Sequence, residues 1–250
     1  MEQKEMKRTL FVVTVAILIL CVLATLVHSR CARPQCSYSR VPLYVYIHVC
    51  CIGEYKQILR RLVAAVKGSC MYDSIKEIRL CVLGSYDPST VVDAKVVVHA
   101  SDPDVSRYEQ HTINVLRADA ERETFYALYL HTKGVTKPGN ERVKDWVEYM
   151  LYFATSPVCP ALLESHDTVG VNLQETPVLH YSGNFWWARS SYLRTLAPCS
   201  YASYNSPEFW LTEGRTGRYA SLWTSGVNHY NERYAPSQYK GMGFRSLNKR

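Results

Sequence analysis

The chain has 250 residues, 47% of them hydrophobic and 20% charged, a balance typical of a globular protein large enough for one substantial core. The formal net charge of +7 comes from 29 lysines and arginines spread along the sequence. Nucleic-acid-binding proteins usually gather their cations on one element, so this spread argues against a nucleic-acid partner and fits an anionic small ligand or simple solubility.

An uncharged apolar run near the N-terminus predicts a membrane anchor. Residues 10–27, LFVVTVAILILCVLATLV, approach the ~18-residue length of a membrane-spanning helix. The preceding Lys4, Lys7 and Arg8 favour a cytoplasmic N-terminus,. A cleaved signal peptide is the alternative, but the length of the run favours an uncleaved anchor. We expect a cytoplasmic tail over 1–9, the anchor over 10–27, a stem over 28–42 and a domain over 43–250 outside the cytoplasm.

Nine cysteines fit that compartment without fixing any pairing,. Cys21 lies within the apolar run, which leaves eight outside it, and the odd total leaves at least one unpaired within a monomer,. No two pairs have the spacing of a zinc finger, so a structural zinc site is not expected.

Beyond the stem, strands alternate with amphipathic helices. The runs at 43–50, 75–84, 94–100 and 125–132 are rich in β-branched and aromatic residues and predict strands,. Helical periodicity predicts helices over 54–68 and 108–123 between them,. Nearly continuous apolar strands separated by helices indicate an α/β fold, with a mostly parallel open sheet covered by helices on both faces.

The second half continues the pattern less regularly. A helix is predicted over 141–155, a short one from Pro157 to about His166, and a fifth strand over 168–173,. Residues 182–196, SGNFWWARSSYLRTL, predict an apolar strand that runs into a helix. Beyond Pro198 the sequence is rich in Tyr, Ser, Asn and Gly and predicts mixed structure.

The fourth predicted strand ends in a loop with one histidine and two lysines. In open parallel sheets, ligands bind at the carboxyl ends of the strands, and His131, Lys133 and Lys137 follow such an end. Gly134 allows close approach of a ligand, and the lysines offer cations to an anionic group. A polar strand end that meets solvent is the simpler explanation for any one of these residues.

Two aspartates after the third strand form a possible metal site. Asp102 and Asp104 can bind a divalent cation through carboxylate oxygens, but Asp-Pro-Asp before a helix is also a common turn and N-cap. The sequence contains no Walker loop, GxGxxG, HExxH or GxSxG motif, which argues against several large enzyme classes.

Aromatic residues suggest a second group of candidates. The 19 tyrosines suit sugar rings, although half-buried tyrosines around a sheet explain them equally well. Of Trp186 and Trp187, one is expected in the core, while the other can line a cavity with Asn184; core packing of both is the alternative. Glu208 lies in an aromatic neighbourhood that can raise the pKa of a carboxylate toward the range of a general base. The alternative is an ordinary helix N-terminal residue.

Several blocks together resemble a family of glycosyltransferase-like proteins from microbes, algae and large DNA viruses. The similarity extends over residues 43–212, and its most specific parts are the blocks LYLHTKGVT and HYSGNFWWARSSYL. It implies a GT-A type nucleotide-diphospho-sugar transferase fold. The expected arrangement of tail, anchor, stem and domain resembles a type II membrane enzyme of the Golgi or endoplasmic reticulum.

The resemblance also implies roles for residues. Gly53 and Glu54 would lie near the nucleotide, Asn184, Trp187 and Tyr181 near the acceptor sugar, and Glu208 where a base removes the acceptor proton. Where the wider GT-A pattern has a metal-binding Asp-x-Asp, this chain has His131, Thr132 and Lys133. We therefore hypothesise that Lys133, with His131, Thr132 and Lys137, faces the donor diphosphate directly; otherwise Mn²⁺ or Mg²⁺ would bind at Asp102 and Asp104.

The leading prediction is thus a membrane-anchored glycosyltransferase that uses a nucleotide-sugar donor and a glycan or glycoprotein acceptor. The first alternative is a non-catalytic carbohydrate-binding or scaffold protein with the same fold. The second is a membrane-tethered structural protein held by disulfides.

Overall fold

The structure is a computed structural model that describes residues 41–201, 203–242 and 247–248. The predicted tail and anchor and nearly all of the predicted stem lie outside these residues. Within the described part of the chain, no helix is both long enough and apolar enough to cross a membrane.

Ten strands and six α-helices make up the regular structure of the described residues. The strands are β1 (Leu43–Cys50), β2 (Ile75–Leu83), β3 (Val96–Asp102), β4 (Tyr126–His131), β5 (Thr168–Gly170), β6 (Leu173–Gln174), β7 (His180–Tyr181), β8 (Trp186–Arg189), β9 (Tyr219–Ser221) and β10 (Leu247–Asn248). The α-helices are α2 (Tyr55–Gly68), α3 (Tyr108–Arg122), α4 (Glu141–Ala154), α5 (Val158–Leu162), α6 (Ser190–Leu193) and α7 (Ser206–Trp210). Short 3₁₀ turns lie at Tyr72–Ser74, Pro88–Thr90, Val105–Arg107, Glu213–Arg215 and Pro236–Gln238.

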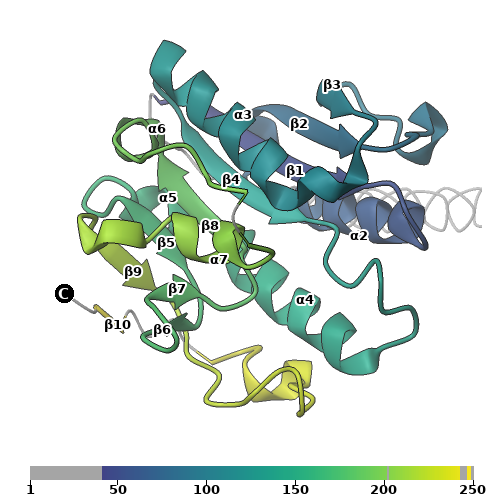
Figure 1. Ribbon diagram of the computed structural model, residues 1–250. Coiled ribbons are helices and arrows are strands. Elements are labelled where there is room, and N and C mark those ends of the chain that lie inside the picture. The colour runs from purple at the N-terminus through teal and green to yellow at the C-terminus, as the bar shows by residue number, and fades with distance from the viewer. Residues whose placement is uncertain (1–40, 202, 243–246, 249–250) are drawn as a thin grey trace, which may run out of the picture. The chain divides into compact units, whose positions relative to one another are not determined.

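Eight of the strands form one sheet in the order β10-β9-β5-β8-β4-β1-β2-β3 (Figure 1). Strands β3, β2, β1 and β4 are parallel neighbours, and β5 and β9 are parallel to each other. Strand β8 is antiparallel to both β4 and β5, and β10 is antiparallel to β9. The predicted mixed α/β fold with a mostly parallel sheet is confirmed.

The two faces of the sheet are covered by different helices. Along β1, Val45 and Ile47 join a core cluster with α2 and α4, while Tyr44 and Tyr46 join a second cluster with α3. This alternation follows from the period of two in a strand. It explains why β1 is apolar at almost every position, because both of its faces are buried,.

Helix α2 shows how the local sequence selects each element. Its Leu59, Leu62, Val63 and Val66 are buried on one face, and each such side chain stabilises the fold by ~1.5–3 kcal/mol. Helix α4 begins where the Asn140 side chain accepts hydrogen bonds from the backbone N–H groups of the first turn,. That cap ends the loop that starts at His131.

The second half of the sheet departs from the sequence-based prediction. The fifth strand ends at Gly170, and the chain turns at Asn172 with φ 50° before β6, which pairs with β7 in a separate two-stranded sheet. The strand predicted within 182–196 is β8, and it runs into α6 as expected. Its antiparallel direction follows from the β6–β7 hairpin, which reverses the chain.

The described cysteines are mostly unpaired. Cys70 forms a disulfide, whereas five are free thiols: Cys50, Cys51, Cys81, Cys159 and Cys199. The core of the described domain therefore depends on packing rather than on a disulfide framework.

Candidate active site

The carboxyl ends of the parallel strands β1 and β4 lie side by side, with His48 paired to His131 in register. The chain leaves β4 at His131 and enters the loop that carries Lys133. At Gly134, φ is 86°, and an added Cβ would lie 2.6 Å from the Val143 side chain. This glycine therefore lets the loop approach α4. The sequence had suggested a different role for Gly134, namely to make room for a ligand.

The imidazole of His131 is buried between two acceptors. Its Nε2 lies 3.1 Å from the Gly183 carbonyl oxygen, and its Nδ1 lies 3.3 Å from Oε1 of Glu109. Burial, followed by the charge of Lys133, lowers the pKa of His131 to about 3,. His131 is therefore uncharged near neutral pH.

Glu109 lies in the first turn of α3 and is held by two donors. Its Oε2 accepts hydrogen bonds from the Tyr129 hydroxyl at 2.8 Å and from Nδ2 of Asn184 at 2.7 Å. Asn184 adopts φ 59°, and its Oδ1 accepts from the indole N–H of Trp186. Asparagine tolerates this left-handed conformation better than most residues. The two hydrogen bonds from Tyr129 and Asn184 fix the Glu109 carboxylate in place, and the one from Trp186 fixes Asn184.

Lys133 lies half-buried over an aromatic ring. Its Nζ is 4.1 Å from the centroid of the Trp146 ring, which stacks on His229. Burial lowers the pKa of Lys133, and the charges of Glu208 and Glu109 oppose that shift. Among the described residues, the ammonium group has no hydrogen bond or close ion pair, so a cation–π contact is its direct interaction.

Glu208 lies on α7, which packs beside α3 (Figure 1), and its charge acts on both His131 and Lys133. Its Oε1 accepts a hydrogen bond from the Gly183 backbone N–H at 2.9 Å. It also occupies the first turn of α7, behind Pro207, which is the position that the helix-terminal interpretation predicts. The backbone of Gly183 thus contacts His131 through its oxygen and Glu208 through its nitrogen.

We call Glu109, His131, Lys133, Asn184 and Glu208 the polar cluster. Three exposed tyrosines lie near it, namely Tyr108, Tyr204 and Tyr230. The rings of Tyr108 and Tyr204 meet edge to face at 5.3 Å. Burial and then nearby carboxylates raise the pKa of Tyr204 and of Tyr230; Glu109 acts on the former and Glu208 on the latter. Exposed aromatic surface beside charged groups is well suited to a polar ligand with an apolar face.

Other predicted phosphate and nucleotide residues lie around this cluster without joining it. The hydroxyl of Thr132 accepts a hydrogen bond from the Cys50 backbone N–H, and Lys137 is exposed with its Nζ 5.5 Å from the Tyr230 ring. Gly53, at φ 49°, closely approaches the backbone oxygen of Val135, and Glu54 is exposed at the start of α2.

The predicted acceptor residues differ in their surroundings. Asn184 belongs to the polar cluster, but Trp187 is fully buried and donates its indole N–H to the Ala154 carbonyl. Tyr181 is also buried, with its hydroxyl bonded to Thr168 and Ala220. Both Trp186 and Trp187 belong to the core, so core packing of both indoles is the interpretation that holds.

Asp102 and Asp104 form a turn before α3. Asp102 accepts from the Asp104 backbone N–H and pairs with Arg107, while Asp104 caps the 3₁₀ turn by accepting from Ser106. These hydrogen bonds lower the pKa of both carboxyls. Within the described residues there is no group of three or more His, Cys, Asp or Glu side chains arranged to hold a metal ion. The turn and N-cap interpretation accounts for the contacts of this pair.

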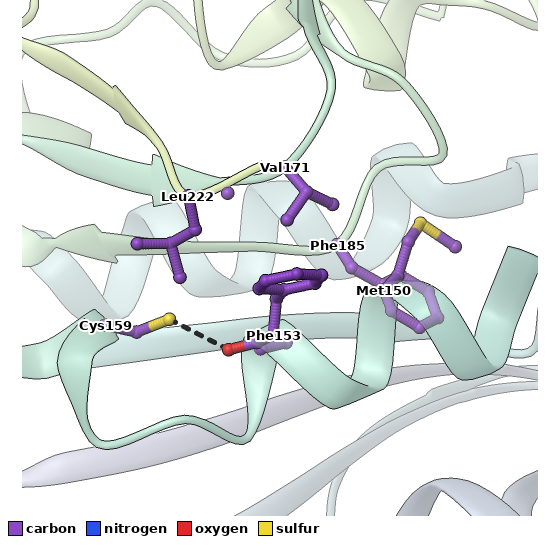
Figure 2. A pocket seen from close by; sticks show the side chains of 8 residues that line it. Met150, Phe153, Cys159, Val171, Phe185 and Leu222 are labelled. Carbon is purple, nitrogen blue, oxygen red and sulfur yellow. Dashed lines mark hydrogen bonds between the residues drawn. The ribbon is translucent and has the colours of Figure 1, made fainter. Parts of the chain in front are cut away.

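A small cavity lies apart from the residues of the polar cluster, none of which lines it. Its lining is apolar and comes from Met150, Phe153, Ala154, Cys159, Gly170, Val171, Phe185 and Leu222 (Figure 2). The Cys159 thiol donates to the Phe153 carbonyl, and burial raises its pKa. This cavity offers no charged group to a ligand.

Sequence reasoning missed Glu109. A glutamate in the first turn of a helix is usually explained by the helix dipole, and nothing in YEQHT distinguishes it from that case. The one available signal was its place after the third parallel strand, at the edge of the sheet where ligands bind.

The comparisons with known proteins identify a family without an activity. A family model described as a domain of unknown function, DUF8361, matches residues 106–232, just over half of the chain, and the chain belongs to this family. All five residues of the polar cluster lie within the matched range, and Gly53, Glu54, Asp102 and Asp104 lie outside it. The search of curated proteins found no match.

Proposed function

We propose that this member of the DUF8361 family is a glycosyltransferase with a GT-A type fold that takes a sugar from a nucleotide-diphosphate donor. The observation that carries the proposal is the convergence of Glu109, His131, Lys133 and Glu208 at the carboxyl end of β4. Ligand sites of open α/β sheets lie at this edge. The membrane anchor of the proposed enzyme rests on residues 10–27 alone.

The polar cluster contains groups suited to both ends of glycosyl transfer. An acceptor oxygen attacks the anomeric carbon as the bond from that carbon to the donor phosphate breaks, and the diphosphate leaves with the electron pair. The acceptor proton passes to a carboxylate, which is Glu208 according to the resemblance. Lys133 has no close ionic partner among the described residues and would stabilise the charge that develops on the leaving diphosphate.

The exposed tyrosines support a carbohydrate ligand. Tyr204 and Tyr230 are exposed near the carboxylates of Glu109 and Glu208, and the exposed Tyr108 packs against Tyr204. Such side chains suit a sugar with its apolar face and hydroxyl rim. A carbohydrate-binding scaffold would use the same tyrosines. It would have no need of a buried histidine that contacts a carboxylate, so the polar cluster favours the enzyme.

Binding of sugar nucleotides tests the proposal directly. The full-length protein is heated with UDP-glucose, UDP-galactose, UDP-N-acetylglucosamine or GDP-mannose, with and without Mn²⁺ or Mg²⁺. A donor at ~100 times its Kd stabilises the folded state by ~2.7 kcal/mol, which raises Tm by ~5–10 °C for a domain of this size. Nucleotide release is then measured for each donor that binds. A scaffold shows neither the shift nor the release.

Two lysine variants show whether the diphosphate lies at Lys133. Lys133→Met keeps the apolar stem over Trp146 and removes the charge, and Lys137→Met is the matched control on the exposed part of the loop. We expect K133M to weaken donor binding at least tenfold, or ~1.4 kcal/mol, and K137M to change it little. If a chelator abolishes transfer while K133M retains it, a metal and not Lys133 faces the phosphates.

A further inference from the structure

The His131 ring has one proton too few for its two contacts. Nε2 faces the Gly183 carbonyl and Nδ1 faces the Glu109 carboxylate, and both oxygens are acceptors. A neutral imidazole carries a single N–H. The hydrogen-bond geometry places that proton on Nε2, so the Nδ1 lone pair is directed toward the Glu109 side. One added proton between Oε1 and Nδ1 would convert this contact into a hydrogen bond.

The rest of the Glu109 carboxylate is already satisfied. Tyr129 and Asn184 both donate to Oε2, so a proton that reaches the carboxylate has its place on Oε1. The Glu109 side chain keeps 23% of its surface exposed, and a ligand hydroxyl can therefore approach it. Oε1 therefore belongs to a partly exposed carboxylate and lies 3.3 Å from a second proton acceptor, Nδ1 of His131.

The neighbouring charges favour the state without this proton. Burial and Lys133 keep His131 neutral, and the Lys133 ammonium interacts favourably with the Glu109 carboxylate. His48, on β1, is also neutral, since burial lowers its pKa to about 4. The hydrogen bond to the Gly183 carbonyl and the charge of Glu208, on α7, favour a proton on His131, but burial and Lys133 outweigh them. Lys133 therefore favours a pair that starts as carboxylate plus neutral imidazole.

We infer that Glu109, supported by His131, is the general base that takes the proton of the acceptor hydroxyl, an inference that rests on the proposed glycosyl transfer. The hydroxyl O–H bond breaks, its proton moves to Oε1 of Glu109, and the oxygen forms a bond to the anomeric carbon as the diphosphate leaves. Nδ1 of His131 then accepts a hydrogen bond from the protonated carboxyl. Glu109 takes the role that the resemblance implies for Glu208, which instead positions the Gly183 backbone.

Two isosteric variants separate these roles. Glu109→Gln keeps an acceptor for Tyr129 and Asn184, and Glu208→Gln keeps an acceptor for the Gly183 N–H. With water as the acceptor, nucleotide release from a bound UDP-sugar or GDP-sugar should fall ~10²–10⁴-fold in E109Q and less than tenfold in E208Q, with donor-induced thermal shifts retained. The opposite ranking of the two variants would overturn the assignment to Glu109 and leave the proposed transferase intact.

A nucleophile without a proton distinguishes a base from a structural residue. Azide needs no base, so it should restore nucleotide release in Glu109→Ala, with a glycosyl azide as product, and should not restore it in K133M. Failure of azide to restore E109A would mean that Glu109 only holds the site together.

The protonation state can be measured without any turnover. Nitrogen NMR of the His131 ring, assigned with His131→Asn, should show a neutral imidazole protonated on Nε2 at neutral pH. A doubly protonated ring would mean that the pair already holds its proton, and the inference would fail whatever the enzyme does. If the protein turns over no donor at all, the proposed function fails together with the role of Glu109 as a base.

Discussion

The backbone of Gly183 contacts both His131 and Glu208 of the polar cluster. Its replacement by alanine should lower the stability of the fold for two separate reasons. The residue has φ 95°, and an added Cβ would lie 2.3 Å from Sδ of Met150 and 2.9 Å from Nε1 of Trp146. The left-handed backbone costs ~1–2 kcal/mol for a residue with a Cβ. Forced overpacking of a core adds ~1–3 kcal/mol. The sum is ~2–5 kcal/mol, or a fall in Tm of ~4–20 °C.

Gly139→Ala is the matched control. Gly139 also has positive φ, at 70°, but an added Cβ meets no atom within 4 Å. This variant should therefore lose only the backbone part, ~1–2 kcal/mol. Thermal unfolding of both full-length variants measures the difference. Equal losses of stability in the two would refute the packing around Gly183, and with it the close contact between the β7–β8 loop and α4.

Three further predictions concern stability. Burial lowers the pKa of His48 to about 4. The neutral ring stabilises the fold fully above the unfolded pKa of ~6.5, and its contribution to the unfolding free energy should fall by ~1.4 kcal/mol per pH unit below that value, in addition to the falls from His131 and His229, whose pKa values are also lowered. Chemical denaturation measures the total slope, and His48→Gln should reduce it by the His48 share. Although burial raises the pKa of Asp93, hydrogen bonds from Lys67 and Tyr72 lower it to about 2. Asp93→Asn should therefore reduce Tm above ~pH 4. The difference in Tm between this variant and the unaltered protein should disappear as the pH falls toward about 2. Arg79 contacts Tyr46, Asp119 and Glu123 in a buried network, and Arg79→Met should lower the unfolding free energy by ~3–5 kcal/mol. The control Arg215→Met, which breaks an exposed pair with Glu175, should leave urea unfolding nearly unchanged.

The parallel half of the sheet was predictable because its signals are local. Strands β1, β2 and β4 are buried on both faces and read as continuous apolar runs, and α2 carries its apolar stripe at helical spacing. The antiparallel insertion of β8 was not predictable. It depends on the turn at Asn172 and on a two-residue hairpin, and elements that short leave no periodicity to detect.

The residues of the candidate site were likewise predictable only where a local sequence signal marks them. His131 and Lys133 follow directly from the strand-end rule, because the end of β4 is marked in the sequence. Glu109 and Gly183 are brought to them by the packing of α3 and the β7–β8 loop, at separations of 22 and 52 residues from His131 along the sequence. Trp187 was misplaced because a strand with two buried faces gives its two neighbouring indoles to opposite core clusters. Residue type alone does not specify the face.

The charges of the polar cluster lead to a last prediction. With His131 neutral, Lys133 contributes one positive charge against the two carboxylates of Glu109 and Glu208. A diphosphate that binds at Lys133 without a metal is therefore repelled by Glu208, whose charge also acts on the lysine. If that repulsion is ~1 kcal/mol, as for partly screened charges, Glu208→Gln should bind UDP about fivefold more tightly than the unaltered protein.

Titration calorimetry with UDP measures this effect, and Glu164→Gln, which removes an exposed carboxylate just beyond α5, is the charge-matched control. Tighter binding in E208Q alone supports direct recognition of the diphosphate by Lys133. Weaker binding in E208Q that appears only with Mn²⁺ or Mg²⁺ would have the opposite meaning, because Mg²⁺ is commonly held by one or two carboxylates together with substrate phosphates. Glu208 would then be a metal ligand, and the hypothesis that cationic side chains replace the metal would be wrong.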